Sequence, residues 1–362
     1  MKTSRVLSCF AIGSIISVLL VTGLTLHIIT DTLLHPRWYR ESSGGRLRVG
    51  WPEALVQGDP RRLYGLPYED VEFPASYDGN VTIRGWWVPA PSPSDVVIVA
   101  VHGSGGNRRE YLRQVKGFIL NDRDPSASFN MLLFDCVGGS GESDRPPKGQ
   151  PEITFGRRES KDVLAAAAFA KQTKGMKSVI AIGHSLGASA VLMAGGSTEG
   201  KELIDMVIAE NPFASFEDVF REHAPKRLRG GRSGTFQSLG PHLGLLVGRL
   251  LDGFVSPVLV DWVTSYMLWR LEYEPRAQPK EVVHRISPRP LMLIHGKDDH
   301  LCPFSHSLLL FERASEPKEF WEVSTAAHAV PFDTVGSPRV YHERVRGFIH
   351  RHLTGNVASH EE

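Results

Sequence analysis

A serine flanked by two glycines lies near the middle of the chain, in the pentapeptide Gly183-His184-Ser185-Leu186-Gly187. A G-x-S-x-G sequence at a point where a strand turns into a helix presents its serine hydroxyl for nucleophilic attack. The glycines are needed because side chains at their positions would collide with each other and with the strand. A serine hydroxyl is a weak nucleophile by itself, so this chemistry requires a histidine base and a carboxylate that orients the base.

The residues on either side of the pentapeptide predict that turn. Val179 to Ile182 is a short apolar, β-branched run of the kind found in buried parallel strands. Small and apolar helix formers follow from Leu186 onward. The backbone N–H of Leu186 would then lie at a helix N-terminus, where it can stabilise developing negative charge.

Two later apolar strands end in residues that could complete the chemistry. Leu291 to Ile294 is followed by H-G-K-D-D-H-L-C-P, which contains the adjacent carboxylates Asp298 and Asp299. Phe320 to Val323 precedes a loop that contains His328. A nucleophile, an acid and a base therefore occur in the order Ser, Asp, His, which is the chain order of one known hydrolase architecture.

This arrangement resembles the alpha/beta-hydrolase superfamily, and in particular membrane-anchored bacterial esterase-like and serine aminopeptidase-type hydrolases. The resemblance implies an α/β fold with a mostly parallel central sheet, helices on both faces and a helical cap insertion. It implies Ser185 as nucleophile, Asp299 as triad acid and His328 as general base. Asp298 is the adjacent alternative, and alternating side-chain direction lets only one of the two carboxylates face the site easily.

The same resemblance implies an oxyanion hole. Val96 to Val101 is an apolar strand that ends in His102-Gly103-Ser104-Gly105-Gly106-Asn107. An H-G-x motif at this place in the superfamily supplies a second backbone donor, which here is the N–H of Ser104 beside that of Leu186. The alternative is an ordinary glycine-rich turn.

Two more acidic residues follow predicted strands. Asp135 ends the strand Met131 to Phe134, where relatives carry D-x-R-G-x-G-x-S, but Val137 stands at the usual arginine position. We expect Asp135 to brace its loop. Glu210 follows the strand Asp205 to Ala209 and is a second candidate for the triad acid, although a structural role is preferred.

The N-terminal segment Val6 to Ile29 contains no Asp, Glu, Lys or Arg. About 20 apolar residues suffice to cross a bilayer as a helix. We therefore predict a single-pass membrane anchor, with a cleaved signal peptide as the alternative. The side of the membrane stays open, because the flanking arginines favour a cytoplasmic domain whereas Asn80-Val81-Thr82 is a glycosylation sequon.

The expected domain organisation follows from these segments. Residues 1–30 form the anchor or signal peptide, 31–68 a linker, and 69–355 an alpha/beta-hydrolase domain. Within that domain, an insertion at about 213–285 interrupts the strand series and is far longer than an ordinary connection. Its apolar runs predict lid helices, which either pack on the core or line an apolar acyl-binding pocket beside the membrane.

Composition limits the classes of partner. The 41 basic and 40 acidic side chains nearly balance, which argues against a nucleic-acid partner. The three cysteines are widely spaced, and the 15 histidines show no H-E-x-x-H or C-x-x-C spacing. We expect no metal and no cofactor.

The expected activity is hydrolysis of carboxylic esters, with a small-molecule or lipid ester as substrate and the N-terminal segment as membrane contact. An acyltransferase is one alternative, because His328 and Asp333 form an H-x4-D string. A serine aminopeptidase on the same triad is a second alternative. A membrane-tethered binding or scaffold protein is a third, and the oligomeric state stays open.

Overall fold

The computed structural model describes residues 17, 20–35, 58–119, 128–228, 257–324, 327–328 and 338–355. The chain divides into two compact units. Unit 1 comprises Met1–Arg37 and Phe220–Tyr273, and unit 2 comprises Trp38–Val219 and Glu274–Glu362. The boundaries 220 and 273 fall inside the predicted insertion 213–285, whose residues 229–256 lie outside the described part.

Unit 2 is built on one sheet of eight strands in the order β1-β2-β4-β3-β5-β6-β7-β8. The strands are β1 (Glu69–Ala75), β2 (Asp78–Val88), β3 (Val96–Val101), β4 (Asn130–Phe134), β5 (Ser178–His184), β6 (Met206–Glu210), β7 (Leu291–Gly296) and β8 (Lys318–Val323). β2 pairs antiparallel with β1 and with β4, and every other neighbouring pair is parallel. The predicted mostly parallel sheet is confirmed.

The parallel strands bury both of their faces, as their near-continuous apolar sequences require. Along β3, Val97, Val99 and Val101 belong to one buried cluster, whereas Ile98 and Ala100 belong to the other. This alternation follows from the two-residue period of a strand. Each face therefore needs a layer of helices to cover it.

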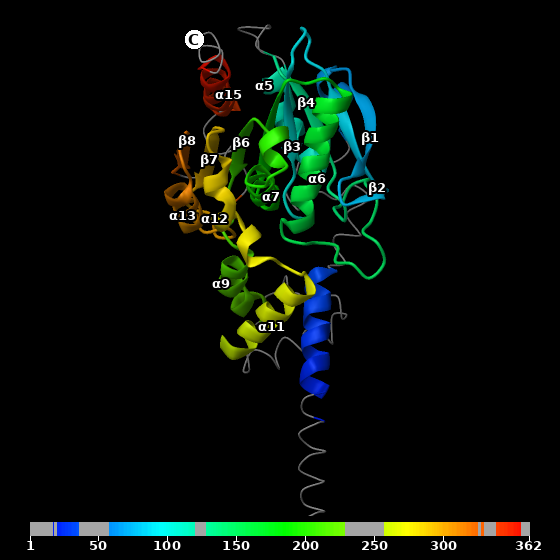
Figure 1. Cartoon of the computed structure of the whole chain (residues 1–362), viewed down its shortest axis with the longest axis vertical. Coiled ribbons are helices and arrows are strands. Elements are labelled where there is room, and N and C mark those ends of the chain that lie inside the picture. The colour runs from blue at the N-terminus through cyan, green and yellow to red at the C-terminus, as the bar shows by residue number, and fades with distance from the viewer. Residues whose placement is uncertain are drawn as a thin grey trace, which may run out of the picture. The chain divides into compact units, whose positions relative to one another are not determined.

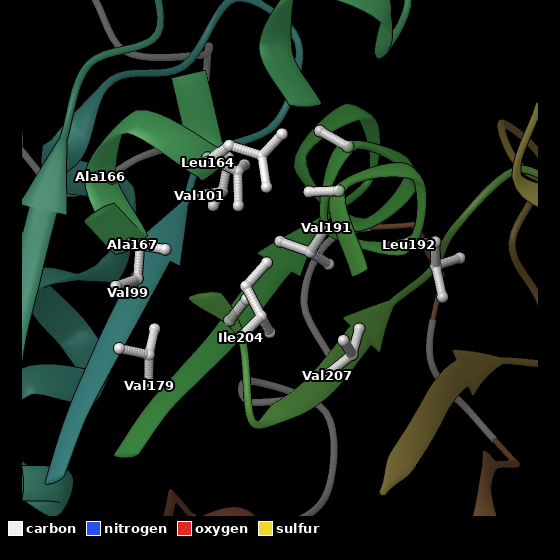
Figure 2. Close-up of a cluster of buried hydrophobic side chains, with 14 of the residues drawn as sticks. Val99, Val101, Leu164, Ala166, Ala167, Val179, Val191, Leu192, Ile204 and Val207 are labelled. Carbon is white, nitrogen blue, oxygen red and sulfur yellow. The ribbon is translucent and has the colours of Figure 1, made fainter. Parts of the chain in front are cut away.

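Helices α6 (Arg157–Ala168) and α7 (Leu186–Gly195) cover one face, and Figure 1 shows both in front of the strands. Their small side chains let the helix backbones approach the sheet closely. In Figure 2, Ala166 and Ala167 from α6 and Val191 from α7 lie beside valines of the strands. The alanines of α6 thus form a slim face that packs on the sheet, and the helix continues as a π-helical turn, Phe169–Thr173.

The other face is covered by α5 (Leu112–Ile119) and α15 (Pro338–Gly355), which contribute Phe118, Tyr341 and Phe348 to the second cluster. The remaining helical segments are α4 (Pro60–Tyr64), η2 (Arg108–Tyr111), α8 (Gly200–Leu203), α9 (Phe216–Leu228), α11 (Pro257–Arg270), η6 (Pro275–Ala277), α12 (Pro279–Val282), η7 (Val283–Ile286) and α13 (Phe304–Arg313). Helices on both faces of the sheet confirm the predicted layer architecture.

The N-terminal segment is described only in part. Residues 20–34 are helical, whereas residues 6–16, 18 and 19 of the predicted anchor lie outside the described residues. Within the described part, we find no helix with the length and apolar character needed to cross a membrane. Most of the predicted linker, residues 36–57, also lies outside that part.

Candidate active site

Ser185 occupies a strained turn between β5 and α7. Its φ of 56° lies in a region that residues with side chains rarely adopt. A Cβ added at Gly183 would overlap the backbone of Gly187, and one added at Gly187 would overlap the carbonyl of Val101. Both glycines are therefore required, for the steric reason that the sequence predicts.

The turn brings Ser185 to the two residues with which the sequence groups it. The Ser185 hydroxyl lies 2.9 Å from Nε2 of His328, and Nδ1 of His328 lies 2.7 Å from a carboxylate oxygen of Asp299. All three side chains are buried. Because an ionised carboxylate can only accept, Nδ1 carries the imidazole proton, and Nε2 is left to accept the proton of the hydroxyl.

Asp299 is held in its ionised form by the groups around it. Burial works to raise the pKa of this carboxyl, but hydrogen bonds from His295 and His328 outweigh burial and hold the pKa well below its ordinary value. Its other oxygen accepts the N–H groups of Leu301 and Cys302, each at 2.8 Å. The carboxylate therefore remains charged and oriented toward the imidazole across the neutral pH range.

A second set of contacts fixes the backbone of His328. Its carbonyl accepts hydrogen bonds from Nε2 of His184 at 3.0 Å and from Nδ2 of Asn211 at 3.1 Å. Nδ1 of His184 lies 2.7 Å from a carboxylate oxygen of Glu110. The pentapeptide histidine thus links the nucleophile turn to the loop that carries the base. No local sequence pattern identifies this role of His184 or its partner Glu110.

Glu110 also contacts the predicted oxyanion loop. Its second carboxylate oxygen accepts the N–H of Gly103 at 3.2 Å. A Cβ at Gly103 would lie 3.3 Å from the Cβ of Ser185, so the loop passes directly beside the nucleophile. Ser104 follows in this loop, and Leu186 is the first residue of α7, where its N–H has no partner within the helix. Each predicted donor is therefore one residue away in sequence from a residue that lies at this turn, Gly103 for Ser104 and Ser185 for Leu186.

Comparison with known proteins identifies the family of the chain. The model of the alpha/beta hydrolase family matches residues 98–343, which is more than half of the chain. The chain belongs to the alpha/beta hydrolase family. The described part of the match contains all the residues grouped around Ser185.

This alpha/beta hydrolase is similar to two sequence relatives and to one solved structure. The protein YfhR of Escherichia coli O157:H7 is 27% identical over 286 residues, covering 78% of this chain and 80% of YfhR. Human monoglyceride lipase is 26% identical over 295 residues, covering 76% of this chain and 88% of the lipase. The esterase Pf2001 of Pyrococcus furiosus superposes with a TM-score of 0.56 at 21% identity, covering 84% and 97% of the two chains, and shows the shared fold.

The other acidic candidates lie in different surroundings. Asp298 is exposed, in contrast to its buried neighbour Asp299. Glu210 is hydrogen bonded to the hydroxyls of Tyr341 and Tyr111, and burial raises the pKa of its carboxyl. Neither residue is the partner of the His328 imidazole, which contacts Asp299.

Asp135 braces its loop, as expected for this alpha/beta hydrolase. Its two oxygens accept the N–H groups of Arg108 and Glu142, each at 2.7 Å. Within this loop, the Arg158 guanidinium donates to the carbonyl of Val137 at 3.2 Å. Among the described residues, no group of three or more His, Cys, Asp or Glu side chains is arranged to hold a metal ion.

Proposed function

We propose that this alpha/beta hydrolase is a serine hydrolase that cleaves carboxylic esters through an acyl-enzyme on Ser185. The observation that carries the proposal is the continuous path from the Ser185 hydroxyl through the His328 imidazole to Asp299, with contacts of 2.9 and 2.7 Å. That path supplies a nucleophile, a base and an orienting carboxylate in one buried site.

The proposed reaction runs in two halves. Nε2 of His328 takes the proton of Ser185 as its oxygen attacks the ester carbonyl, and the N–H groups of Ser104 and Leu186 stabilise the resulting oxyanion. The ester C–O bond breaks as His328 returns the proton to the leaving alcohol. Water then attacks the acyl-enzyme with the same base, which releases the acid and regenerates Ser185.

A lipid-like monoester is the substrate class that we favour. The relative in human cells is named for the hydrolysis of monoglycerides, and the match covers 88% of its length. Pf2001, which shares the fold, is named as an esterase. The breadth of the family allows other acyl groups, because pocket shape and not fold selects the substrate.

A fluorophosphonate probe on the purified chain tests the nucleophile. The wild type should be labelled, Ser185→Ala should not, and Ser305→Ala, which alters an exposed serine of α13, should be labelled like the wild type. Labelling that persists in Ser185→Ala would reject the nucleophile. An unlabelled, folded wild type would instead support a binding or scaffold role.

A graded panel of substrates then tests the bond that is cleaved. Release of acid from nitrophenyl esters and monoacylglycerols, without amine release from aminoacyl amides, is the expected result. Preferential amide cleavage would favour an aminopeptidase. Transfer of the acyl group to an added alcohol faster than to water would favour an acyltransferase, for which Asp333 lies outside the described residues.

A further inference from the structure

Exposed apolar side chains are concentrated in unit 1. Seven of the ten exposed large apolar side chains in the described part of the chain belong to this unit, although most described residues belong to unit 2. The seven are Leu20, Val21, Leu24, Ile28, Val258, Trp262 and Trp269. A monomeric soluble surface rarely gathers so many, and such gatherings mark contact with a protein or a membrane.

The helix formed by residues 20–34 changes character along its length. Leu20, Val21 and Leu24 are 68%, 65% and 61% exposed, whereas Ile29 and Leu34 are buried. No Asp, Glu, Lys or Arg occurs before Asp31 in this helix, and the uncharged sequence continues back to Val6. An apolar helix that is exposed around most of its circumference is suited to lipid and not to water.

Helix α11 is apolar on two opposite faces. Val260, Val263 and Met267 are buried, whereas Trp262 and Trp269 are 53% and 71% exposed. The exposed positions 258, 262, 265 and 269 recur every three or four residues and therefore form one stripe along the helix. We call Val258, Trp262 and Trp269 the outer stripe of α11.

Polar contacts hold the two helices together at one level within unit 1. Nδ1 of His27 lies 3.2 Å from the hydroxyl of Tyr266, and Arg270 forms an ion pair with Asp31 at 3.0 Å. Residues 27 and 31 thus pair with residues 266 and 270 in the same order, so the two helices run in the same direction. The ion pair lies where the apolar helix becomes polar, and Trp269 is adjacent to it in sequence.

We propose that unit 1 docks onto a phospholipid bilayer through residues 20–28 and the outer stripe of α11, with the ion-pair end of both helices, and Trp269 with it, in the interfacial region. A bilayer offers both environments at once, since tryptophan prefers the headgroup level and aliphatic side chains prefer the layer below. The sequence from Val6 to Leu19, which precedes this helix in the chain, is likewise free of Asp, Glu, Lys and Arg. The docking surface is independent of the proposed hydrolase activity.

Fluorescence quenching in vesicles tests this placement. The full chain is reconstituted in phosphatidylcholine and phosphatidylglycerol vesicles whose acyl chains carry bromine either near the headgroup or near the terminal methyl. Wild-type emission should be quenched, and more strongly by the shallow bromine. The variant with Trp262→Phe and Trp269→Phe should lose the larger part of this quenchable emission.

Matched variants test whether lipid quenching is specific to the docking surface or depends on any exposed apolar side chain. Leu308→Ser changes a side chain of unit 2 that is 49% exposed, and its quenching should equal that of the wild type. Ser185→Ala should also be quenched like the wild type, so failure of the hydrolase proposal would leave this result untouched. Circular dichroism confirms that each variant is folded.

Two results would overturn the proposal. One is equal quenching in the wild type and in the Trp262→Phe, Trp269→Phe variant, which would place both tryptophans away from lipid. The other combines two observations. A short bis-maleimide cross-links two copies of the Trp262→Cys variant, made in a Cys9→Ser background, and brominated lipid fails to quench the remaining tryptophan of the outer stripe, Trp269. That outcome would show that a second copy of the chain covers the stripe.

Discussion

At the scale of single residues, the site depends on which of two neighbouring carboxylates meets the imidazole. Asp299 is buried and contacts His328, whereas Asp298 is exposed. A hydrogen-bonded, ionised carboxylate keeps the imidazole in the tautomer that can accept the serine proton. Replacing it by an amide keeps the shape of the side chain and removes the charge.

We therefore expect Asp299→Asn to lower kcat for a soluble nitrophenyl ester by about 10⁴-fold, as the loss of a triad carboxylate does elsewhere. Asp298→Asn is the matched control and should stay close to the wild-type rate. Steady-state kinetics on both variants measure the difference. A larger loss in Asp298→Asn than in Asp299→Asn would exchange the two assignments.

Glu110 and His184 act on the site through other residues. The two ring nitrogens of His184 contact two oxygens: Nε2 contacts the carbonyl of His328, and Nδ1 contacts the carboxylate of Glu110. Each of these two hydrogen bonds needs one proton. Through them, the His328 backbone and the Gly103 loop share one anchor. We infer that Glu110 is a positioning residue.

Glu110→Gln should lower kcat on the order of tenfold to a hundredfold with little change in KM, because small misplacement of a catalytic group slows chemistry more than binding. Glu199→Gln, at an exposed glutamate, should leave both constants unchanged. Kinetics on a short soluble ester, with the melting temperature measured in parallel, check this. A rise in KM at constant kcat would contradict a positioning role.

At the scale of elements, the strands could be predicted because their apolar runs are short, continuous and bounded by turns. The resemblance to the hydrolase superfamily implied the roles of the residues after β3, β5, β7 and β8, and the parallel strands bring those ends to one edge of the sheet. The Glu110 to His184 contact could not be predicted, since its partners are 74 residues apart and no local pattern records the pairing.

One helix carries a buried acid whose titration should affect stability. Asp162 of α6 is fully buried and accepts the N–H of Val137, and burial raises the pKa of its carboxyl to about 8. Below that pH the folded chain keeps the proton, whereas the unfolded chain loses it above about pH 4. The unfolded state therefore binds fewer protons between these values, and the stability of the fold falls as pH rises through this window.

Asp162→Asn should remove this contribution while its amide oxygen still accepts the Val137 N–H. As pH rises from 5 to 8, the free energy of unfolding of Asp162→Asn should fall less steeply than that of the wild type. The two slopes should differ by up to about 1.4 kcal/mol per pH unit. Urea unfolding at several pH values measures the slope, with Asp298→Asn as an exposed control. Equal slopes in wild type and Asp162→Asn would show that the carboxyl is already ionised in the folded state.

At the scale of the whole molecule, the chain combines segments that sequence order keeps far apart. Unit 1 joins the N-terminal residues to the insertion, and His27 meets Tyr266 across 239 positions. The sequence predicts an apolar N-terminal segment and an apolar insertion separately. It does not predict that they pair, because the N-terminal segment has no charged face and α11 is apolar on two opposite faces, so neither shows one apolar stripe that would identify a shared face.

The Arg270 to Asp31 ion pair should measurably stabilise that pairing. Arg270 also donates to the Thr30 hydroxyl at 3.3 Å, and its side chain is 15% exposed, whereas that of Asp31 is 49% exposed. Because Asp31 is half in solvent, we expect Arg270→Gln to cost only about 1 kcal/mol locally. Amide hydrogen exchange of residues 29–34 should then accelerate roughly fivefold in detergent micelles.

Arg276→Gln serves as the control for this measurement, since Arg276 is an exposed arginine six positions further along and belongs to unit 2. Its exchange pattern should match that of the wild type. In Arg270→Gln the amides of β5 and β6 should keep wild-type rates, because the ion pair lies within unit 1. Faster exchange throughout both units would mean that Arg270 supports the fold as a whole. Unchanged exchange at residues 29–34 would mean that apolar packing alone joins the helix of residues 20–34 to α11.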